Sequence, residues 1–225
     1  MDLFPLYNSL RVALISTVCT FLIGMGAAYA VCRLPRAVKG VLDCILTLPL
    51  VLPPTVVGFF LLKTIGPKAP LGAFLLQTFQ LKMTMTWYSA IFATVIVTFP
   101  LMYRTARGAF ESFDPRLSCS AQTLGLSNTF IFWRIRLPNC KAGLVAGAVL
   151  SFARALGEYG ATSMVTGYIP GRTATISTTV YQLWREGNDS EAYRWVMINL
   201  AISLMVLMAV NFLERRAPKR GEVAQ

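Results

Sequence analysis

Long apolar runs without a charged residue most constrain how this chain can fold. Residues 12–31, 44–62, 83–103 and 195–213 form such runs, and another apolar segment begins near Lys141. A helix needs about 20 residues to cross a bilayer, so each of these runs is close to spanning length. We therefore expect an all-α, polytopic membrane protein that forms a single domain over residues 1–225, with about five transmembrane helices. A sixth crossing would have to use residues 166–186, whose polarity disfavours it.

Two features bear on how the spans are joined and packed. Residues 64–86 are expected to form a polar connection between the second and third runs. The segment that begins near Lys141 carries Gly143 and Gly147, a small-xxx-small pair that predicts close contact with another helix.

The positive charges lie at the ends of these runs. The net charge of +11 would indicate a nucleic-acid partner only if the basic residues clustered on a soluble domain, but just 14% of this chain is charged. Residues 33–40, residues 104–141 and the tail from 214 hold three, six and four Lys or Arg, against seven on the opposite side. The positive-inside rule then predicts a cytoplasmic C-terminus and 104–141 segment, with the N-terminus outside.

The stretch from Asp114 to Pro138, DPRLSCSAQTLGLSNTFIFWRIRLP, interrupts the apolar runs and predicts two short helices. Asp114 suits the N-cap of the first helix, and Gly125 suits the left-handed residue that closes it. Ser127 can cap a second helix, which we expect to stop at Pro138. Between the caps, an apolar edge recurs at helical spacing, formed by Leu117, Ala121 and Leu124. The edge either packs on the membrane domain of its own chain or docks into a groove on a partner protein.

The second apolar run is interrupted by prolines. Pro49, Pro53 and Pro54 all fall within residues 44–62. A membrane tolerates freed backbone groups only where protein or a wet cavity satisfies them. The run is therefore either a kinked, well-packed helix or a broken helix that lines a translocation path.

Two polar features fall in or beside the later spans. Arg154 and Glu158 are four residues apart, so they can pair with each other, and either can instead contact an anion or an outer delivery protein. Residues 166–184 form a hydroxyl-rich segment that offers donors suited to a tetrahedral oxyanion, or else an interfacial helix with a solvated side. The donors considered there are Arg172, Thr173, Thr175 and Ser177.

The sequence lacks the usual signatures of an enzyme. It contains no histidine and no GxxxxGK[ST] phosphate-binding loop, so we expect neither triad chemistry nor ATP binding by that route. The cysteines number five and form no CxxC pair, so we expect reduced thiols and no metal site. The chain itself should therefore need no cofactor.

Spacing within the 114–138 stretch resembles the loop signature of ABC importer permeases: Gly125, nine residues, Ile135, one residue, then Leu137-Pro138. The family's usual Glu-Ala-Ala start falls on Cys119, Ser120 and Ala121, so the acidic residue is absent. In that family the loop docks on the ATP-hydrolysing subunit. The resemblance therefore implies a coupling loop at residues 107–138. Its implied docking residues are Asp114, Leu117, Cys119, Ala121, Leu124, Gly125, Leu126, Ile135, Leu137 and Pro138.

Further blocks resemble the permease subunit of bacterial molybdate importers, and sulfate permeases are close relatives. The blocks are LPLVLPPTVVGFFLL, FPLMYRTARGAFESFD, SFARALGEYGAT and YIPGRTATISTTVY, and with the loop they cover most of residues 46–184. The resemblance implies a type I ABC importer permease fold and a homodimeric pore for molybdate, with tungstate not distinguished. It also implies two cytoplasmic subunits that bind ATP and Mg²⁺, and an extracytoplasmic oxyanion-binding protein. The alternatives are a sulfate or thiosulfate permease and a secondary anion transporter, although the chain shows neither internal repeats nor several intramembrane carboxylates.

Overall fold

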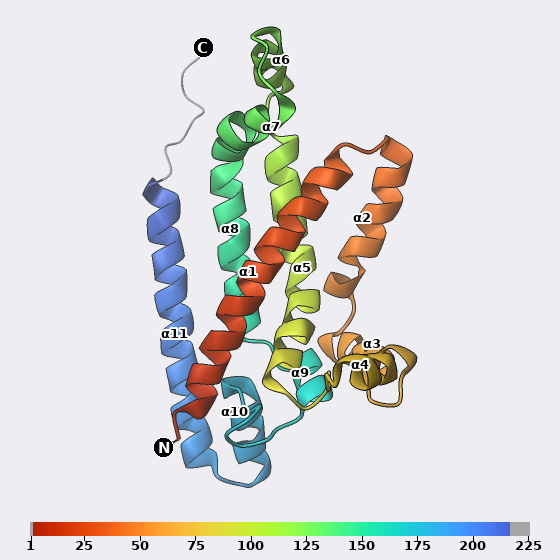
Figure 1. Ribbon diagram of the computed structural model, residues 1–225. Coiled ribbons are helices and arrows are strands. Elements are labelled where there is room, and N and C mark those ends of the chain that lie inside the picture. The colour runs from red at the N-terminus through yellow and green to blue at the C-terminus, as the bar shows by residue number, and fades with distance from the viewer. Residues whose placement is uncertain (1, 217–225) are drawn as a thin grey trace.

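The computed structural model describes residues 2–216, and the side chains of residues 2–208. Every regular element in this range is helical (Figure 1). The elements are α1 (Phe4–Cys32), α2 (Arg36–Val51), α3 (Pro54–Ile65), α4 (Pro70–Phe79), α5 (Trp87–Glu111), α6 (Pro115–Thr123), α7 (Asn128–Ile131), the π-helix η1 (Phe132–Arg136), α8 (Leu137–Leu156), α9 (Gly160–Thr166), α10 (Ile176–Arg185) and α11 (Asp189–Arg216).

The described helices agree with about five membrane spans. By length and composition α1, α5 and α11 (Asp189–Met208) can each cross a membrane. Two further pairs pass the same test although each is bent at a break, by 107° between α2 and α3 and by 56° between Asn128–Leu156 and α9. The second span is therefore a broken helix rather than a kinked one, which was one of its two interpretations.

The main core lies where α1, α5 and α8 pack together, and small residues allow these helices to approach closely. Its buried residues include Met102, Tyr103 and Leu144. A Cβ on Gly143 would lie only 2.7 Å from the Ala109 Cβ, and one on Gly147 would lie 3.0 Å from the Thr105 Cβ. The predicted helix contact through this small-xxx-small pair is therefore confirmed.

A second core forms beside the breaks, where α3 and α9 pack on each other and on α5. It is built from residues such as Val57, Leu61 and Val165. A Cβ on Gly58 would lie 2.8 Å from the Ala161 Cα, and one on Gly160 would lie 2.9 Å from the Pro54 Cβ. Both broken spans thus meet backbone to backbone, which leaves no room for larger side chains.

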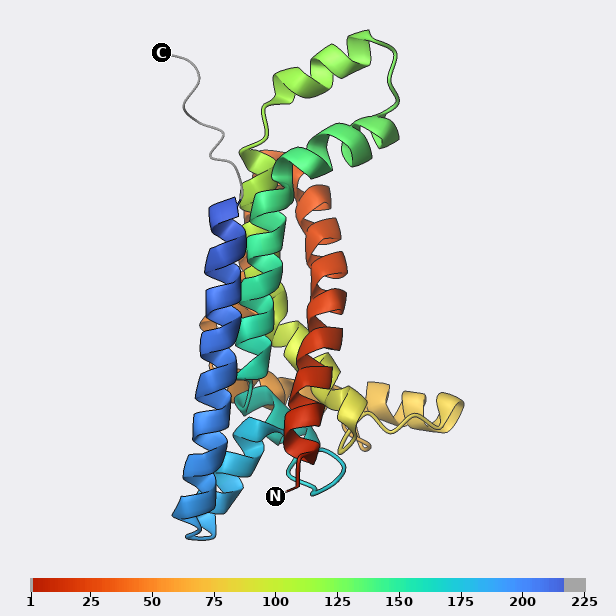
Figure 2. The same cartoon turned by 90° about the vertical axis from the view of Figure 1, so that its left-hand side faces the viewer.

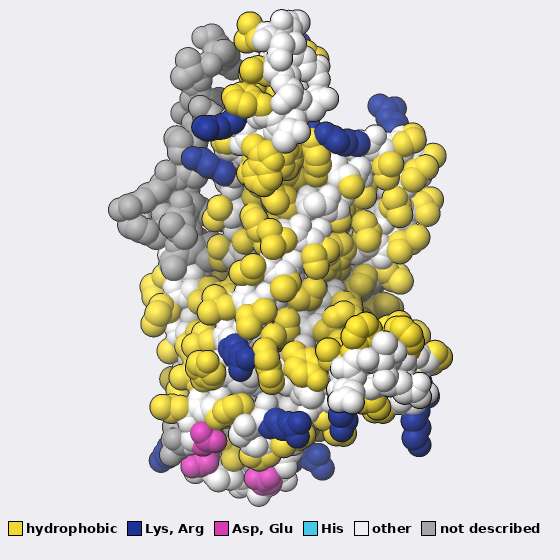
Figure 3. Space-filling view, viewed as in Figure 1, with side chains coloured by type: hydrophobic (Ala, Val, Ile, Leu, Met, Phe, Trp, Pro, Cys, Tyr) yellow, Lys and Arg dark blue, Asp and Glu magenta, His cyan; other side chains and the backbone are white. Residues whose placement is uncertain are grey.

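The bundle has two distinct ends. Figures 1 and 2 show α6 and α7 projecting beyond one end, whereas the N-terminus and α10 lie at the other and α4 extends sideways near it. Apolar side chains cover the middle of the face in Figure 3, and most of its Lys and Arg side chains lie towards the two ends. This distribution is expected of a protein whose middle section is surrounded by lipid.

Two expectations about the connections need correction. Residues 64–86, expected to be a polar connection, contain the apolar helix α4, whose Phe74 and Phe79 are exposed. The fourth span begins at Leu137, ahead of Lys141. A short helix such as α4 lacks the long apolar periodicity by which a span is recognised in sequence. The basic tail from 214 lies largely outside the described residues.

Candidate functional site

The segment between α5 and α8 has the helix ends that its sequence predicts. The Asp114 carboxylate accepts a hydrogen bond of 2.9 Å from the Arg116 N–H, which caps α6. Gly125 adopts a φ of 77°, and the Leu126 N–H returns to the Ala121 carbonyl at 3.2 Å. The Ser127 hydroxyl accepts from the Phe130 N–H at 3.3 Å and so caps α7. Glycine is favoured at position 125 because a Cβ destabilises positive φ.

Pro138 does not stop the second helix, contrary to expectation. The chain continues from α7 through η1 into α8, and Pro138 lies in the first turn of α8. In η1 the Leu137 N–H donates to the Phe132 carbonyl, five residues back. A π-turn widens the helix locally, so that the proline ring, which has no N–H to donate, is accommodated at a register change. The segment between the two long helices is shorter than the coupling loop predicted at 107–138, because α5 extends to Glu111 and α8 begins at Leu137.

The predicted docking residues divide into two groups. Leu117 is 46% exposed and Leu124 is 78% exposed, whereas Ala121 is buried. Ile135 and Leu137 pack against the core of α1, α5 and α8. Of the remaining predicted docking residues, four are exposed and Leu126 is half-buried. The exposed ones are Asp114, Cys119, Gly125 and Pro138. The loop thus has an exposed apolar edge at Leu117 and Leu124 and a base, at Ile135 and Leu137, that packs on the bundle. The exposed side chains of Phe130 and Trp133 add to the apolar surface.

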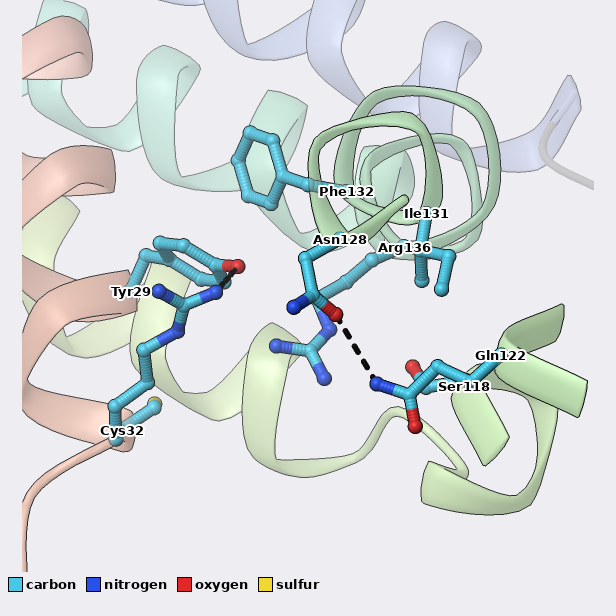
Figure 4. Close-up of a pocket in the computed structure, with 9 residues that line it drawn as sticks. Tyr29, Cys32, Ser118, Gln122, Asn128, Ile131, Phe132 and Arg136 are labelled. Atoms are coloured by element: carbon cyan, nitrogen blue, oxygen red, sulfur yellow. Dashed lines mark hydrogen bonds between the residues drawn. The ribbon is translucent and has the colours of Figure 1, made fainter. Parts of the chain in front are cut away.

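Helix α6 is polar on the side that faces the bundle. Ser118 and Gln122, one turn apart, line a cleft of about 370 Å³ with residues of α1, α7 and η1 (Figure 4). The side-chain amide of Gln122 donates through Nε2 to the side-chain oxygen Oδ1 of Asn128 at 3.0 Å across this cleft. A surface helix normally turns its apolar face inward. Here the apolar residues Leu117 and Leu124 project outward, the arrangement expected of a surface that another protein covers.

The prolines of the second span lie at and near its break. Pro53 is the N-cap residue of α3, Pro54 is the first residue of that helix, and Pro49 lies inside α2. No residue of α2 is buried, which leaves this helix peripheral in the isolated chain. The break itself rests against the second broken span through Gly160 and Pro54.

Arg154 and Glu158 form the predicted ion pair, but not on one continuous helix. Arg154 belongs to α8, whereas Glu158 follows the end of α8 at Leu156. Arg154 Nη1 lies 2.8 Å from Glu158 Oε2, within ion-pair distance. The other carboxylate oxygen, Oε1, accepts from the Ala161 N–H at 2.8 Å. Glu158 therefore holds the two halves of the broken span together, and its side chain is only 1% exposed.

The hydroxyl-rich segment uses two of its four predicted donors internally, and it contains α10, the helix that one of its two alternatives required. The Thr173 hydroxyl accepts from the Ile169 N–H at 3.0 Å. Thr175 and Thr178 form a capping box at the start of α10. Arg172 is exposed and Ser177 half-buried. The segment lies at the end of the molecule opposite α6, so the structure does not bring it together with the predicted docking residues.

One cluster was missed by sequence reasoning. Arg107 pairs with Asp43 of α2 and, at 3.0 Å, with Glu111, which also pairs with Lys39. These contacts tie α2 to α5 near the same end as α6. The i, i+4 spacing of Lys39 with Asp43 and of Arg107 with Glu111 was a visible signal, but nothing in the sequence shows that the two pairs meet.

Comparison with known proteins gives consistent matches along the chain. Residues 20–216 match the family described as binding-protein-dependent transport system inner membrane component. The molybdenum transport system permease protein ModB of Escherichia coli (strain K12) is 37% identical over 214 residues, covering 95% of this chain and 93% of that protein. The sulfate transport system permease protein CysW of Synechococcus elongatus is 31% identical over 215 residues, covering 96% of this chain and 75% of that protein.

A solved structure shares the fold. It is described as a bacterial ABC transporter involved in the import of the acidic polysaccharide alginate, with a TM-score of 0.77 and 20% sequence identity. The match covers 96% of this chain and 80% of that one. At this identity the likeness shows the arrangement of helices alone.

Proposed function

The chain belongs to the family of binding-protein-dependent transport system inner membrane components, and on that premise we propose that it carries molybdate into the cytoplasm as the permease subunit of an ATP-driven importer. It is a multi-pass protein of the inner membrane, and its relatives are transport permeases rather than enzymes. ATP and Mg²⁺ are bound by separate cytoplasmic subunits, which two copies of this chain engage, and an extracytoplasmic protein delivers the oxyanion. Tungstate is carried by the same path.

The observation that carries the coupling role is the outward apolar edge of α6. Leu117 and Leu124 are exposed on a helix capped at both ends, so they are presented in a fixed orientation. An amphipathic helix docks its apolar residues into a groove on a partner. Ile135 and Leu137 at the base of the loop pack on the helix core, so a movement of α6 is transmitted to the bundle. Alternating access then follows from the partner subunits drawing two such helices together and apart.

Energy coupling is required by the charge of the substrate. A dianion that enters a negative-inside cell works against about 2.3 kcal/mol per charge for each 100 mV. A passive pore would therefore exclude the ion rather than concentrate it.

Identity to a molybdenum permease exceeds identity to a sulfate permease, which favours molybdate as the cargo and leaves sulfate as the second candidate.

The orientation proposed here places the N-terminus outside and α6 in the cytoplasm. It is supported by the excess of Lys and Arg near α6 and by the position of the N-terminus at the opposite end of the bundle. Cysteines introduced at positions 2 and 222 of a cysteine-free chain test it, the latter position lying outside the described residues. A membrane-impermeant thiol reagent should label position 2 in intact cells and position 222 only after permeabilisation. Equal labelling of both in intact cells would contradict this orientation.

The transport proposal is tested by ATPase measurements on the purified complex. The chain, its cytoplasmic subunits and the binding protein are reconstituted in lipid, and each oxyanion is added in turn. Molybdate and tungstate should stimulate ATP hydrolysis and uptake in the presence of the binding protein. Stimulation by sulfate alone would identify a sulfate permease. Uptake that needs no ATP and follows a proton or sodium gradient would identify a secondary transporter.

A further inference from the structure

The cleft behind α6 takes no part in the proposed docking, because it opens on the side of the helix that faces the bundle. Four segments line it: α1 with Arg33 at its end, α6, α7 and η1. Its lining residues are Tyr29, Cys32, Arg33, Ser118, Gln122, Asn128, Ile131, Phe132 and Arg136. Its volume of about 370 Å³ falls in the usual range for small-molecule sites, roughly 300–1,000 Å³.

The lining carries two positive charges and no carboxylate. The guanidinium groups of Arg33 and Arg136 lie 4.1 and 5.6 Å from the centre of the Tyr29 ring, and Arg136 also lies 5.1 Å from the Phe113 ring. Among the side chains that the structure describes, no ion pair includes either arginine. Aromatic rings thus bring two like charges near one another without neutralising them. This arrangement favours an anion between them.

Two buried polar atoms in the cleft have no hydrogen-bond partner. One is Nε of Arg136 and the other is the hydroxyl oxygen of Ser118. A buried donor without a partner is unfavourable, so such atoms in a polar cleft indicate a missing partner. Figure 4 shows the Arg136 guanidinium extending into the space beside Asn128, while Ser118 and Gln122 face that space from α6. The amides of Gln122 and Asn128 add neutral hydrogen-bonding groups.

We propose that this cleft binds a tetrahedral oxyanion of the phosphate type, held by Arg33 and Arg136 and by the Ser118 hydroxyl. Arginine presents several N–H donors in a plane that matches such an anion, and a hydroxyl completes the set. The bound anion joins the end of α1 to α6 and η1, so its binding fixes the coupling loop against the bundle. That the cleft opens towards the cytosol rests on the orientation proposed above; the binding itself does not.

The shared chemistry is a phosphate-like group, which can come from a free cytosolic anion or from the headgroup of an anionic lipid. Both sources present oxygen atoms of the same geometry to the arginines. They differ in what competes: soluble anions bind in detergent and in neutral lipid, whereas a lipid headgroup occupies the cleft only when anionic lipid is present. The experiment therefore needs both settings.

The first arm measures the binding of radiolabelled orthophosphate, and of molybdate and sulfate as competitors, to the purified complex without the binding protein. Arg136→Gln should weaken binding about tenfold or more, the effect expected when a charged hydrogen bond is lost. Arg134→Gln is the matched control, because Arg134 lies in the same π-helix and does not line the cleft. Equal affinities for the wild type and Arg136→Gln would overturn the proposal.

The second arm guards against a simple loss of folding, since Arg136 also packs on Phe113. Ser118→Asp places a carboxylate at the cleft, where it can pair with Arg136 in place of the ligand. Anion binding should fall about tenfold or more while the complex elutes as the wild type does. Unchanged binding in this variant would likewise overturn the proposal.

The third arm compares nanodiscs of phosphatidylcholine with nanodiscs that contain phosphatidylglycerol. Loss of orthophosphate binding in the anionic discs, together with its recovery in neutral ones, assigns the cleft to a lipid headgroup. Binding in both assigns it to a free anion, and binding in neither overturns the proposal. Failure of the transport proposal would appear separately, as absent ATPase stimulation by the binding protein with cargo.

Discussion

The two helix breaks, beside α3 and α9, differ from the loop around α6 in what stabilises them. At the breaks, the backbones of two interrupted spans touch through Gly58 and Gly160, and a buried carboxylate bridges α8 and α9. At the loop, a capped helix projects from the bundle with leucines outward and polar residues inward. The first region is held by its own packing, and the second has the surface of a helix that a partner holds.

This difference predicts where substitutions act. Changes at the breaks should lower the stability of the permease itself, because the contacts they remove are internal. Changes at the loop should leave the permease folded and affect its partner instead. Each variant below compares these two outcomes by unfolding in a detergent titration and by co-purification of the cytoplasmic subunits.

The largest effect is expected at Glu158. Glu158→Ala removes the partner of Arg154 and the acceptor of the Ala161 N–H, both within a site where the Glu158 side chain is 1% exposed. Breaking a buried pair costs about 3–5 kcal/mol, and we expect about 3 because the Arg154 side chain is 37% exposed and keeps some solvent. The free energy of unfolding in a detergent titration measures this loss.

The control for Glu158 separates charge from hydrogen bonding. Glu158→Gln keeps an oxygen that can accept from Ala161 and should lose less stability than Glu158→Ala. Arg154→Gln combined with Glu158→Gln should be milder than the sum of the single changes, because the pair is then removed as a unit. Strict additivity would contradict the pairing, and would leave Glu158 acting only through the hydrogen bond that it accepts from the Ala161 N–H.

A smaller effect is expected where the two broken spans touch. Gly58→Ala adds a Cβ that would lie 2.8 Å from the Ala161 Cα, so α3 and α9 must separate, at a cost of about 2 kcal/mol. Gly26→Ala is the matched control, because nothing lies within 4 Å of a Cβ there. That variant should be neutral or up to about 1 kcal/mol more stable, as expected for replacing glycine in a helix. Equal stabilities of the two variants would mean that the contact between the spans is not tight.

These elements also show what sequence reasoning can reach. The spans, the caps at Asp114 and Ser127, the positive φ at Gly125 and the contact through Gly143 and Gly147 were all predicted, because each follows from local pattern. The broken second span was one of two alternatives, since prolines signal that a helix is interrupted without giving the angle.

What was missed depends on tertiary contact. The salt-bridge cluster needs α2 and α5 to be neighbours, and the short apolar helix α4 was hidden among residues expected to be polar. The continuation of the helix through Pro138 depends on a π-turn, for which the sequence contains no clear signal. The inward polarity of Ser118 and Gln122 likewise appears only once α6 is placed beside α7 and η1, across the cleft from α1.

At the loop, Gly125→Val should disrupt coupling without unfolding the bundle. Gly125 has a φ of 77°, which a β-branched residue adopts only at a cost of about 1–2 kcal/mol or more. The end of α6 would then be redirected, so the cytoplasmic subunits should no longer co-purify and uptake should fall. Gly125→Asn is the control, because asparagine tolerates this conformation and should retain most activity. Full uptake by Gly125→Val would show that this loop is not the coupling element.

The smallest effect on the permease itself is expected at Leu117, and it is the sharpest test of the comparison. The Leu117 residue is 46% exposed, and most surface substitutions change stability by no more than about 0.5 kcal/mol. Leu117→Asp should therefore leave the unfolding of the isolated permease unchanged. In the complex, the same carboxylate would enter an apolar groove without a partner, so co-purification of the cytoplasmic subunits should be lost. Cys119→Glu is the matched control: it adds a similar charge to the same helix at the position where related loops carry an acid, and should bind at least as well. If Leu117→Asp instead destabilised the isolated permease and kept its partner, the apolar edge of α6 would be packed on its own chain, and the contrast between the two regions would fail.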